Sequence, residues 1–106
     1  MRTLWVKKEF LDLILSGKKT VEVRVLYPNL RSLKKGEVIK FNGEHPFRVE
    51  DIRVYENFDD LAKSEDAERI VPGKTPAELL ETLRGLYPPA KESLGAVAIE
   101  IMGGED

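Results

Sequence analysis

The sequence predicts a mixed α+β domain built on a small β-barrel or curled sheet with helices around it. Apolar residues follow the period of a strand in some segments and the period of a helix in others. The middle strands follow one another directly, whereas the last strand follows helices, and this order favours a barrel over a doubly wound parallel sheet. A chain of 106 residues with 42% hydrophobic content suffices for one core, so we expect a single domain over residues 1–106.

The N-terminal segment predicts a strand and then a helix. Residues 3–6 (TLWV) are a short β-prone run. In the following KKEFLDLILS, apolar residues at positions 10, 13 and 14 recur with helical spacing, which predicts a helix of about two to three turns. Gly17 suits the position just after the helix end, and Lys18 and Lys19 then lie near the negative end of the helix dipole.

Three strands are expected next. Residues 20–25 (TVEVRV) alternate strictly, which predicts a half-buried strand with its valines facing the core. Residues 37–41 and 46–55 predict two more strands, and the NGEHP between them has the Asn-Gly signal of a hairpin, although its length argues against a two-residue loop. Alternation breaks near Glu50 and Asp51, so we expect a bulge there.

The second half of the chain predicts helices followed by a closing strand. Asn57 is expected to cap FDDLAKS and Ser64 to cap EDAERI. Thr75 and Glu78 have the spacing of a capping box, which predicts the start of the helix TPAELLETLRGLYP. The run AVAIEIM, residues 96–102, predicts the final strand.

Composition excludes several classes of protein. The chain has no run of 18 apolar residues and its N-terminal segment is charged, so we expect no membrane partner and a cytoplasmic location. It has no cysteine and His45 is its one histidine, which excludes disulfides and zinc sites built on paired His or Cys ligands. No metal or other cofactor is expected. The net charge of −2 conceals a basic first half and an acidic second half, so a basic face for an anion remains open.

The stretch SGKKTVEVRV combines these features at one place. Gly17 ends a helix, Lys18 and Lys19 follow on a turn, and the next strand carries Glu22 and Arg24 on its polar face. Such an arrangement can bind an anion or a base edge through flexible cations, an arginine fork and a carboxylate. The alternative interpretation is a solvated strand face, with a Glu22–Arg24 pair worth about 0–1 kcal/mol. In either case we expect Glu22→Gln to change stability little.

The segment LILSGKKTVEVRV resembles the N-terminal signature of ASCH domains, Gly-x-Lys-x-x-Glu-x-Arg, here at Gly17, Lys19, Glu22 and Arg24. Three later segments are similar to further parts of the family pattern: LKKGEVIKF, FRVEDIRVYENFDDLAKSE and LYPPAKESLGAVAIEI. The resemblance implies a PUA-like fold, a small mixed β-barrel flanked by helices with a cleft beside GKKTVEVR. It also implies binding of RNA or a nucleotide, in RNA metabolism or translation-related regulation.

The resemblance also implies which residues bind the nucleic acid. The expected binding residues are Lys18, Lys19, Glu22, Arg24, Tyr87 and Lys91. Tyr87 can stack on a base, although a tyrosine that closes the core at a helix end is an equal alternative. Trp5 is expected in the core or at the barrel rim.

One branch of the family consists of amidohydrolases that release the acetyl group of N4-acetylcytidine. Their nucleophile is a threonine at the position of Glu22, and a catalytic glutamate falls roughly where this chain has Pro72. Because two of three catalytic positions differ, the sequence favours a non-catalytic domain and no catalytic residue is assigned. Two alternatives stay open: a hydrolase of nucleosides or RNA in which Lys19 and Glu22 act as an acid and base pair, and a protein-interaction module with an acidic contact surface. The ligand and the oligomeric state are not fixed by the sequence.

Overall fold

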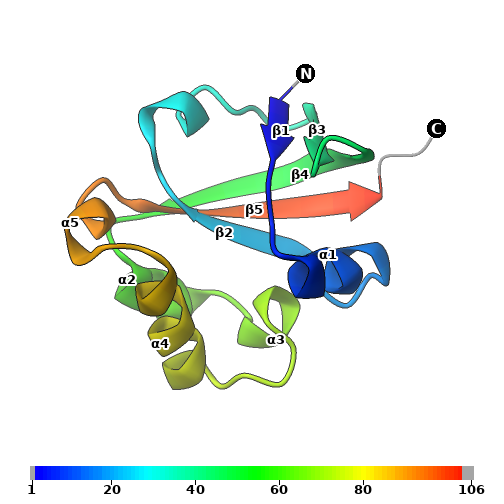
Figure 1. Ribbon diagram of the computed structural model, residues 1–106. Helices are drawn as coiled ribbons and strands as arrows, with labels where there is room; N and C mark the ends of the chain where they lie inside the picture. The colour runs from blue at the N-terminus through cyan, green and yellow to red at the C-terminus, as the bar shows by residue number, and fades with distance from the viewer. Residues whose placement is uncertain (1, 104–106) are drawn as a thin grey trace.

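The computed structural model describes residues 2–103 and has the expected α+β architecture, a curled half-barrel sheet with helices around it (Figure 1). The five strands are β1 (Arg2–Leu4), β2 (Val21–Val25), β3 (Val38–Phe41), β4 (His45–Tyr55) and β5 (Ala96–Gly103). Their order in the sheet is β1-β3-β4-β5-β2. In this order β1 and β2 form the two edges. The β1–β3 pair is parallel and the other pairs are antiparallel.

The helices gather mainly near β2. They are α1 (Lys8–Leu15), α2 (Phe58–Ser64), α3 (Ala67–Ile70), α4 (Pro76–Leu86) and α5 (Pro89–Glu92), with a 3₁₀ turn at Pro28–Leu30. In Figure 1, α2, α3 and α4 lie together on one side of β2, whereas α1 lies near the start of that strand. No helix within residues 2–103 combines the length and the apolar character needed to cross a bilayer.

Alternation along β5 divides the apolar residues into two clusters. Ala96 and Ala98 face α2, α3 and α4 together with the three valines of β2. Val97, Ile99 and Ile101 face the inside of the curl, where they meet residues of β1, β3, β4 and α1. Because β5 lies between β4 and β2, both of its faces are buried. The valine face predicted for residues 20–25 is confirmed.

The β3–β4 hairpin and the bulge in β4 follow the sequence predictions. Asn42 and Gly43 both have positive φ angles, 53° and 77°, as the Asn-Gly signal favours. The register pairs Phe41 with His45, so the connection has one residue more than the tightest turn. The β4–β5 register shifts between Val49 and Asp51, which confirms a bulge at Glu50.

Two of the three predicted helix caps are confirmed and one is wrong. The Asn57 side chain accepts a hydrogen bond from Asp60 N, and Thr75 forms the expected capping box with Glu78. Ser64, however, is the last residue of α2, and α3 is capped by Asp66. The cap moves because Glu65, between the two helices, adopts an extended backbone and binds Arg53 through its side chain.

Within residues 2–103, the edge strands β1 and β2 do not pair with each other. A side-chain contact connects β2 with the segment after β1: Arg24 Nη2 donates to Trp5 O at 2.7 Å. Trp5 therefore lies at the rim, where 67% of it is exposed. This contact positions the rim beside the polar residues of β2.

Candidate functional site

On β2, Glu22 is buried and Arg24 is half-buried, which argues against the alternative of a solvated strand face. Only 6% of Glu22 is exposed. In the β2–β5 register, Glu22 pairs with Ile99 and Arg24 with Val97, so both polar side chains share a face with inward-pointing apolar residues. The strand is covered on its other face by the helices, and its charges must therefore be satisfied by the protein itself.

Lys19 is also buried, with 4% of its surface exposed, so it is not the flexible cation expected from the sequence. Its ammonium donates to Val21 O at 2.8 Å and to Ile70 O at 3.0 Å. It also lies 3.0 Å from Glu22 Oε1. These three acceptors match the three donors of a lysine ammonium. Thr20 N donates to Arg69 O at 2.9 Å, which brings α3 against the lysine and encloses it.

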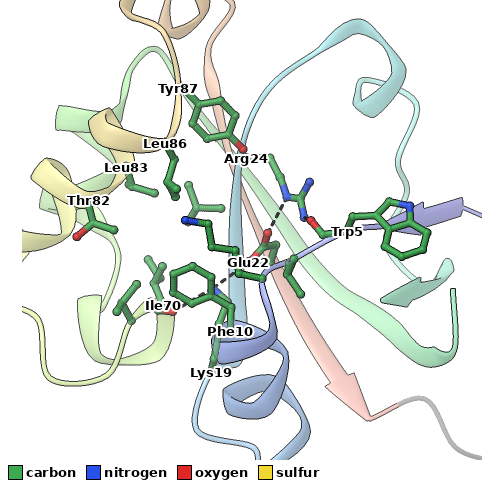
Figure 2. A pocket seen from close by; sticks show the side chains of 14 residues that line it. Trp5, Phe10, Lys19, Glu22, Arg24, Ile70, Thr82, Leu83, Leu86 and Tyr87 are labelled. Carbon is green, nitrogen blue, oxygen red and sulfur yellow. Dashed lines mark hydrogen bonds and ion pairs between the residues drawn. The ribbon is translucent and has the colours of Figure 1, made fainter. Parts of the chain in front are cut away.

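Glu22 joins two cations. Its Oε1 contacts Lys19, and its Oε2 accepts a hydrogen bond from Arg24 Nε at 2.6 Å. Arg24 in turn donates a hydrogen bond to Trp5 O. One chain of contacts therefore runs from the buried Lys19 to the exposed rim (Figure 2). We call Lys19, Glu22 and Arg24 the Glu22 triad. With two cations and one carboxylate, the triad has a net charge of +1.

A cavity of about 240 Å³ lies along the outer edge of β2. We call it the edge cavity. Its walls combine three aromatic side chains, four charged side chains and aliphatic groups from α3 and α4. The lining residues are Trp5, Val6, Lys7, Phe10, Lys19, Glu22, Val23, Arg24, Ile70, Val71, Thr82, Leu83, Leu86 and Tyr87. Figure 2 shows these side chains arranged around β2. Cations outnumber carboxylates in this wall by three to one, which favours an anionic ligand.

Tyr87 closes the core, which is one of the two roles that the sequence left open, and it also reaches the edge cavity. Its ring packs against Phe58 and Tyr27, with centroids 5.7 and 6.4 Å away, so it closes the core at the end of α4. It also lines the edge cavity, and Figure 2 shows its hydroxyl directed toward β2. Burial raises the pKa of this hydroxyl, and the positive charge of Arg24 opposes the rise. The side chain is thus a neutral polar group at the cavity wall.

Four of the six predicted binding residues line the edge cavity, and two do not. Lys19, Glu22, Arg24 and Tyr87 line it. Lys18 is exposed on the turn after α1. Lys91 is exposed on α5, with its Nζ 6.0 Å from the centroid of the Tyr27 ring. Neither residue belongs to the wall of the cavity.

The sequence prediction missed four residues of the cavity before β2: Trp5, Val6, Lys7 and Phe10. The signal was present, since the run LWVKKEF interleaves aromatic and basic residues, as single-strand binding surfaces do. The sequence pattern instead assigned Trp5 to the core or the barrel rim, and Phe10 to the apolar face of a helix. Phe10 does contact the triad, because the Lys19 ammonium lies 5.8 Å from its ring centroid.

A second ion-pair network lies outside the edge cavity. Arg53 binds Glu65 through two nitrogens, at 2.6 and 2.9 Å, and binds Glu100 at 2.9 Å. Burial opposes ionisation of Glu65, but hydrogen bonds from Arg53 and Tyr55 outweigh it and lower the pKa of this carboxyl. Arg53 belongs to the basic half of the sequence and Glu65 to the acidic half, so the two halves partly neutralise each other here.

Among residues 2–103, no three His, Cys, Asp or Glu side chains are grouped so that they could hold an ion. The polar groups of the edge cavity are instead the cations and the single carboxylate described above.

The fold agrees with the family match. The model of the ASCH domain matches residues 4–103, and the chain belongs to the ASCH domain family. The crystal structure of hypothetical protein PH0355 has 34% sequence identity and a TM-score of 0.87, over 95% of this chain and 97% of that one. The solution structure of protein PF0455 from Pyrococcus furiosus has 37% identity and a TM-score of 0.79, over 99% and 98% of the two chains. No curated protein matches the sequence.

Proposed function

We propose that this ASCH domain binds RNA or a nucleotide in the edge cavity, and that this binding serves RNA metabolism or translation-related regulation. One observation carries the proposal: an exposed tryptophan and three cationic side chains line one cavity that contains a single carboxylate. Aromatic faces stack on unpaired bases, and cationic side chains attract the phosphate. Membership of the ASCH family supports the same class of ligand.

The lining residues divide into contact residues and supporting residues. Trp5 supplies a stacking surface at the rim, and Lys7, which is exposed, supplies a charge for a phosphate. Arg24 uses Nε for Glu22 and Nη2 for Trp5 O, and a guanidinium has five N–H donors, so donors remain for a ligand. Lys19 and Glu22 hold Arg24 in position and contribute the net charge of the triad.

The geometry favours binding over acid and base catalysis. The three donors of the Lys19 ammonium match three acceptors, and each oxygen of Glu22 contacts a cation. A general acid or base needs a proton or a lone pair directed at the substrate. The donors of Lys19 are taken up by the protein and both oxygens of Glu22 contact buried or half-buried cations, so the pair is engaged in structural contacts, which counts against a hydrolase that uses Lys19 and Glu22.

The proposal can be tested with the fluorescence of Trp5, because the chain contains one tryptophan. Purified protein is titrated with single-stranded RNA, duplex RNA and the four nucleoside 5′-monophosphates at two salt concentrations. We expect quenching by single-stranded RNA or nucleotides, with affinity that falls as salt rises.

A matched pair of variants locates the binding. In an anisotropy assay with labelled RNA, Trp5→Ala should weaken binding, whereas Val54→Ala should not, since Val54 is an exposed apolar residue that is not part of the cavity wall. The proposal is wrong if no RNA or nucleotide binds, or if the two variants bind equally well.

A further inference from the structure

The main-chain hydrogen bonds between β2 and β5 show which residues of β2 turn their N–H and C=O groups to its outer edge. Ile101 N donates to Thr20 O, and Leu26 N donates to Gly95 O. These bonds show that the even-numbered residues of this segment pair with β5, because partners alternate in an antiparallel ladder. The N–H and C=O groups of Val21, Val23 and Val25 therefore point to the outer edge, where no other strand of residues 2–103 pairs with β2.

The protein itself occupies part of this edge on both sides of Val23. Val21 O accepts a hydrogen bond from Lys19 Nζ. Val25 O accepts one from Tyr27 N at 2.8 Å. The N–H of Val25 interacts with the Tyr87 hydroxyl; this interaction lowers the pKa of Tyr87, although burial raises it by more. Within residues 2–103, the outer N–H and C=O of Val23 have no hydrogen-bond partner.

Val23 lines the edge cavity, so this free pair adjoins the space proposed for the ligand. In an edge-facing strand residue, the N–H donor and the C=O acceptor lie next to each other and point the same way. The Watson–Crick edge of each nucleobase likewise carries a donor beside an acceptor. A base in the plane of the strand edge can therefore bond to both groups of Val23.

From this match we propose that the main chain of Val23 reads the Watson–Crick edge of one unpaired base. The inference rests on the proposed function and specifies how the ligand is recognised. A base in a duplex uses this edge for its own pairing, so the site selects single-stranded or extruded bases. The cavity volume of about 240 Å³ is below the roughly 300–1,000 Å³ of sites for larger ligands, in keeping with a single base.

An added peptide strand fits this edge less well. Strand addition needs successive alternate residues to offer their N–H and C=O groups. Here Lys19 occupies the carbonyl of Val21, and Tyr27 occupies that of Val25. Because the carbonyls on both sides are occupied, Val23 is the position of β2 that offers both its N–H and its C=O, which suits a short planar group better than a continuous ladder.

The test compares nucleotides that differ by one methyl group on the base. UMP is compared with 3-methyluridine 5′-monophosphate, and GMP with 1-methylguanosine 5′-monophosphate, by Trp5 quenching and by ¹⁵N NMR of the labelled protein. Methylation removes the base donor that Val23 O would accept but leaves charge and phosphate unchanged. We expect binding weakened about tenfold or more, because a carbonyl loses its partner, and a downfield shift of the Val23 amide with the unmethylated nucleotides alone.

The failures of the two proposals are distinguishable. Trp5 quenching with equal affinity for methylated and unmethylated nucleotides, or with an unmoved Val23 amide, would overturn the Val23 inference and leave the proposed function standing. Absence of any RNA or nucleotide binding would overturn both. An extended peptide that shifts the amides of Val21, Val23 and Val25 together would replace base reading with strand addition.

Discussion

Lys19 and Glu22 form a buried ion pair, with Nζ 3.0 Å from Oε1 and more than nine-tenths of each side chain removed from solvent. Removing one partner from such a pair leaves an uncompensated charge in the interior, which costs far more than the loss of a surface pair. Lys19 and Glu22, which belong to the motif that resembles the ASCH signature, are thus also part of the structural core. This double role changes what mutations in the motif are expected to do.

Glu22→Gln should destabilise the protein by about 3–5 kcal/mol, because Lys19 and Arg24 would lose their shared carboxylate. This expectation replaces the small effect predicted from the sequence. The measurement is the free energy of unfolding in urea at neutral pH. Asp12→Asn is the matched control: it breaks the exposed Lys8–Asp12 pair and should cost about 0–1 kcal/mol. Equal losses in the two variants would contradict a structural role for the buried pair.

Arg24→Lys should release Trp5, because an ammonium cannot reproduce the fork that contacts Glu22 and Trp5 O together. We expect lower fluorescence anisotropy of Trp5 and weaker RNA binding, although the charge is kept. Arg48→Lys is the control, since Arg48 donates to Gly36 O on the surface. Unchanged Trp5 anisotropy in Arg24→Lys would show that the rim is held by other contacts.

Lys7→Ala should weaken RNA binding and reduce its salt dependence by about one phosphate contact, because Lys7 is an exposed cation in the cavity wall. Lys18→Ala and Lys91→Ala remove exposed cations outside that wall and should have smaller effects. The measurement is the slope of log affinity against log salt for each variant. Equal slopes for all three would mean that the binding surface is broader than the edge cavity.

Local sequence patterns predicted the parts of the fold that depend on neighbouring residues. The valine alternation of β2, the bulge at Glu50 and the caps at Asn57 and Thr75 each depend on a few adjacent positions, and each was confirmed. The α3 cap was wrong because the conformation of Glu65 depends on Arg53, which lies on a different element. A contact between side chains of different elements cannot be predicted from the sequence pattern around the cap.

The candidate site was harder to predict for the same reason. Alternation assigned Glu22 and Arg24 to a polar face, and polar strand faces are commonly solvated. Lys19 is buried because α3 packs against it, and its ammonium donates to the Ile70 carbonyl of that helix. Ile70 lies far from Lys19 in the sequence, so no local pattern indicates the contact. Trp5 lines the cavity because the Arg24 side chain, on β2, binds the main-chain carbonyl of Trp5 in the segment after β1. These tertiary contacts decide which residues of the motif face a ligand.

Stability should fall in acid partly because of Glu65. Burial disfavours the charged form of this carboxyl, yet bonds from Arg53 and Tyr55 prevail, and its pKa lies below the usual value of 4.5. A lowered native pKa contributes stability above the unfolded-state pKa of about 4.3, and that contribution is lost as pH falls through the native value. Urea unfolding from pH 7 to pH 3 should therefore show a larger loss for wild type than for Glu65→Gln. Parallel pH profiles would contradict a lowered pKa at Glu65.

The wild-type protein should not release acetate from N4-acetylcytidine above the buffer control. Resemblance to the amidohydrolase branch puts Glu22 where that branch has its threonine nucleophile, and both oxygens of Glu22 are engaged by cations. A carboxylate with each oxygen tied to a cation, Lys19 on one side and Arg24 on the other, is held in place by charge-assisted contacts and is not presented to a substrate as an activated nucleophile is. Acetate release is followed over time with wild type, and a folded Asp12→Asn variant serves as a preparation control. Turnover in both that is lost in Glu22→Asp, after circular dichroism has verified its fold, would show that this carboxylate takes part in a reaction and would refute a purely binding role.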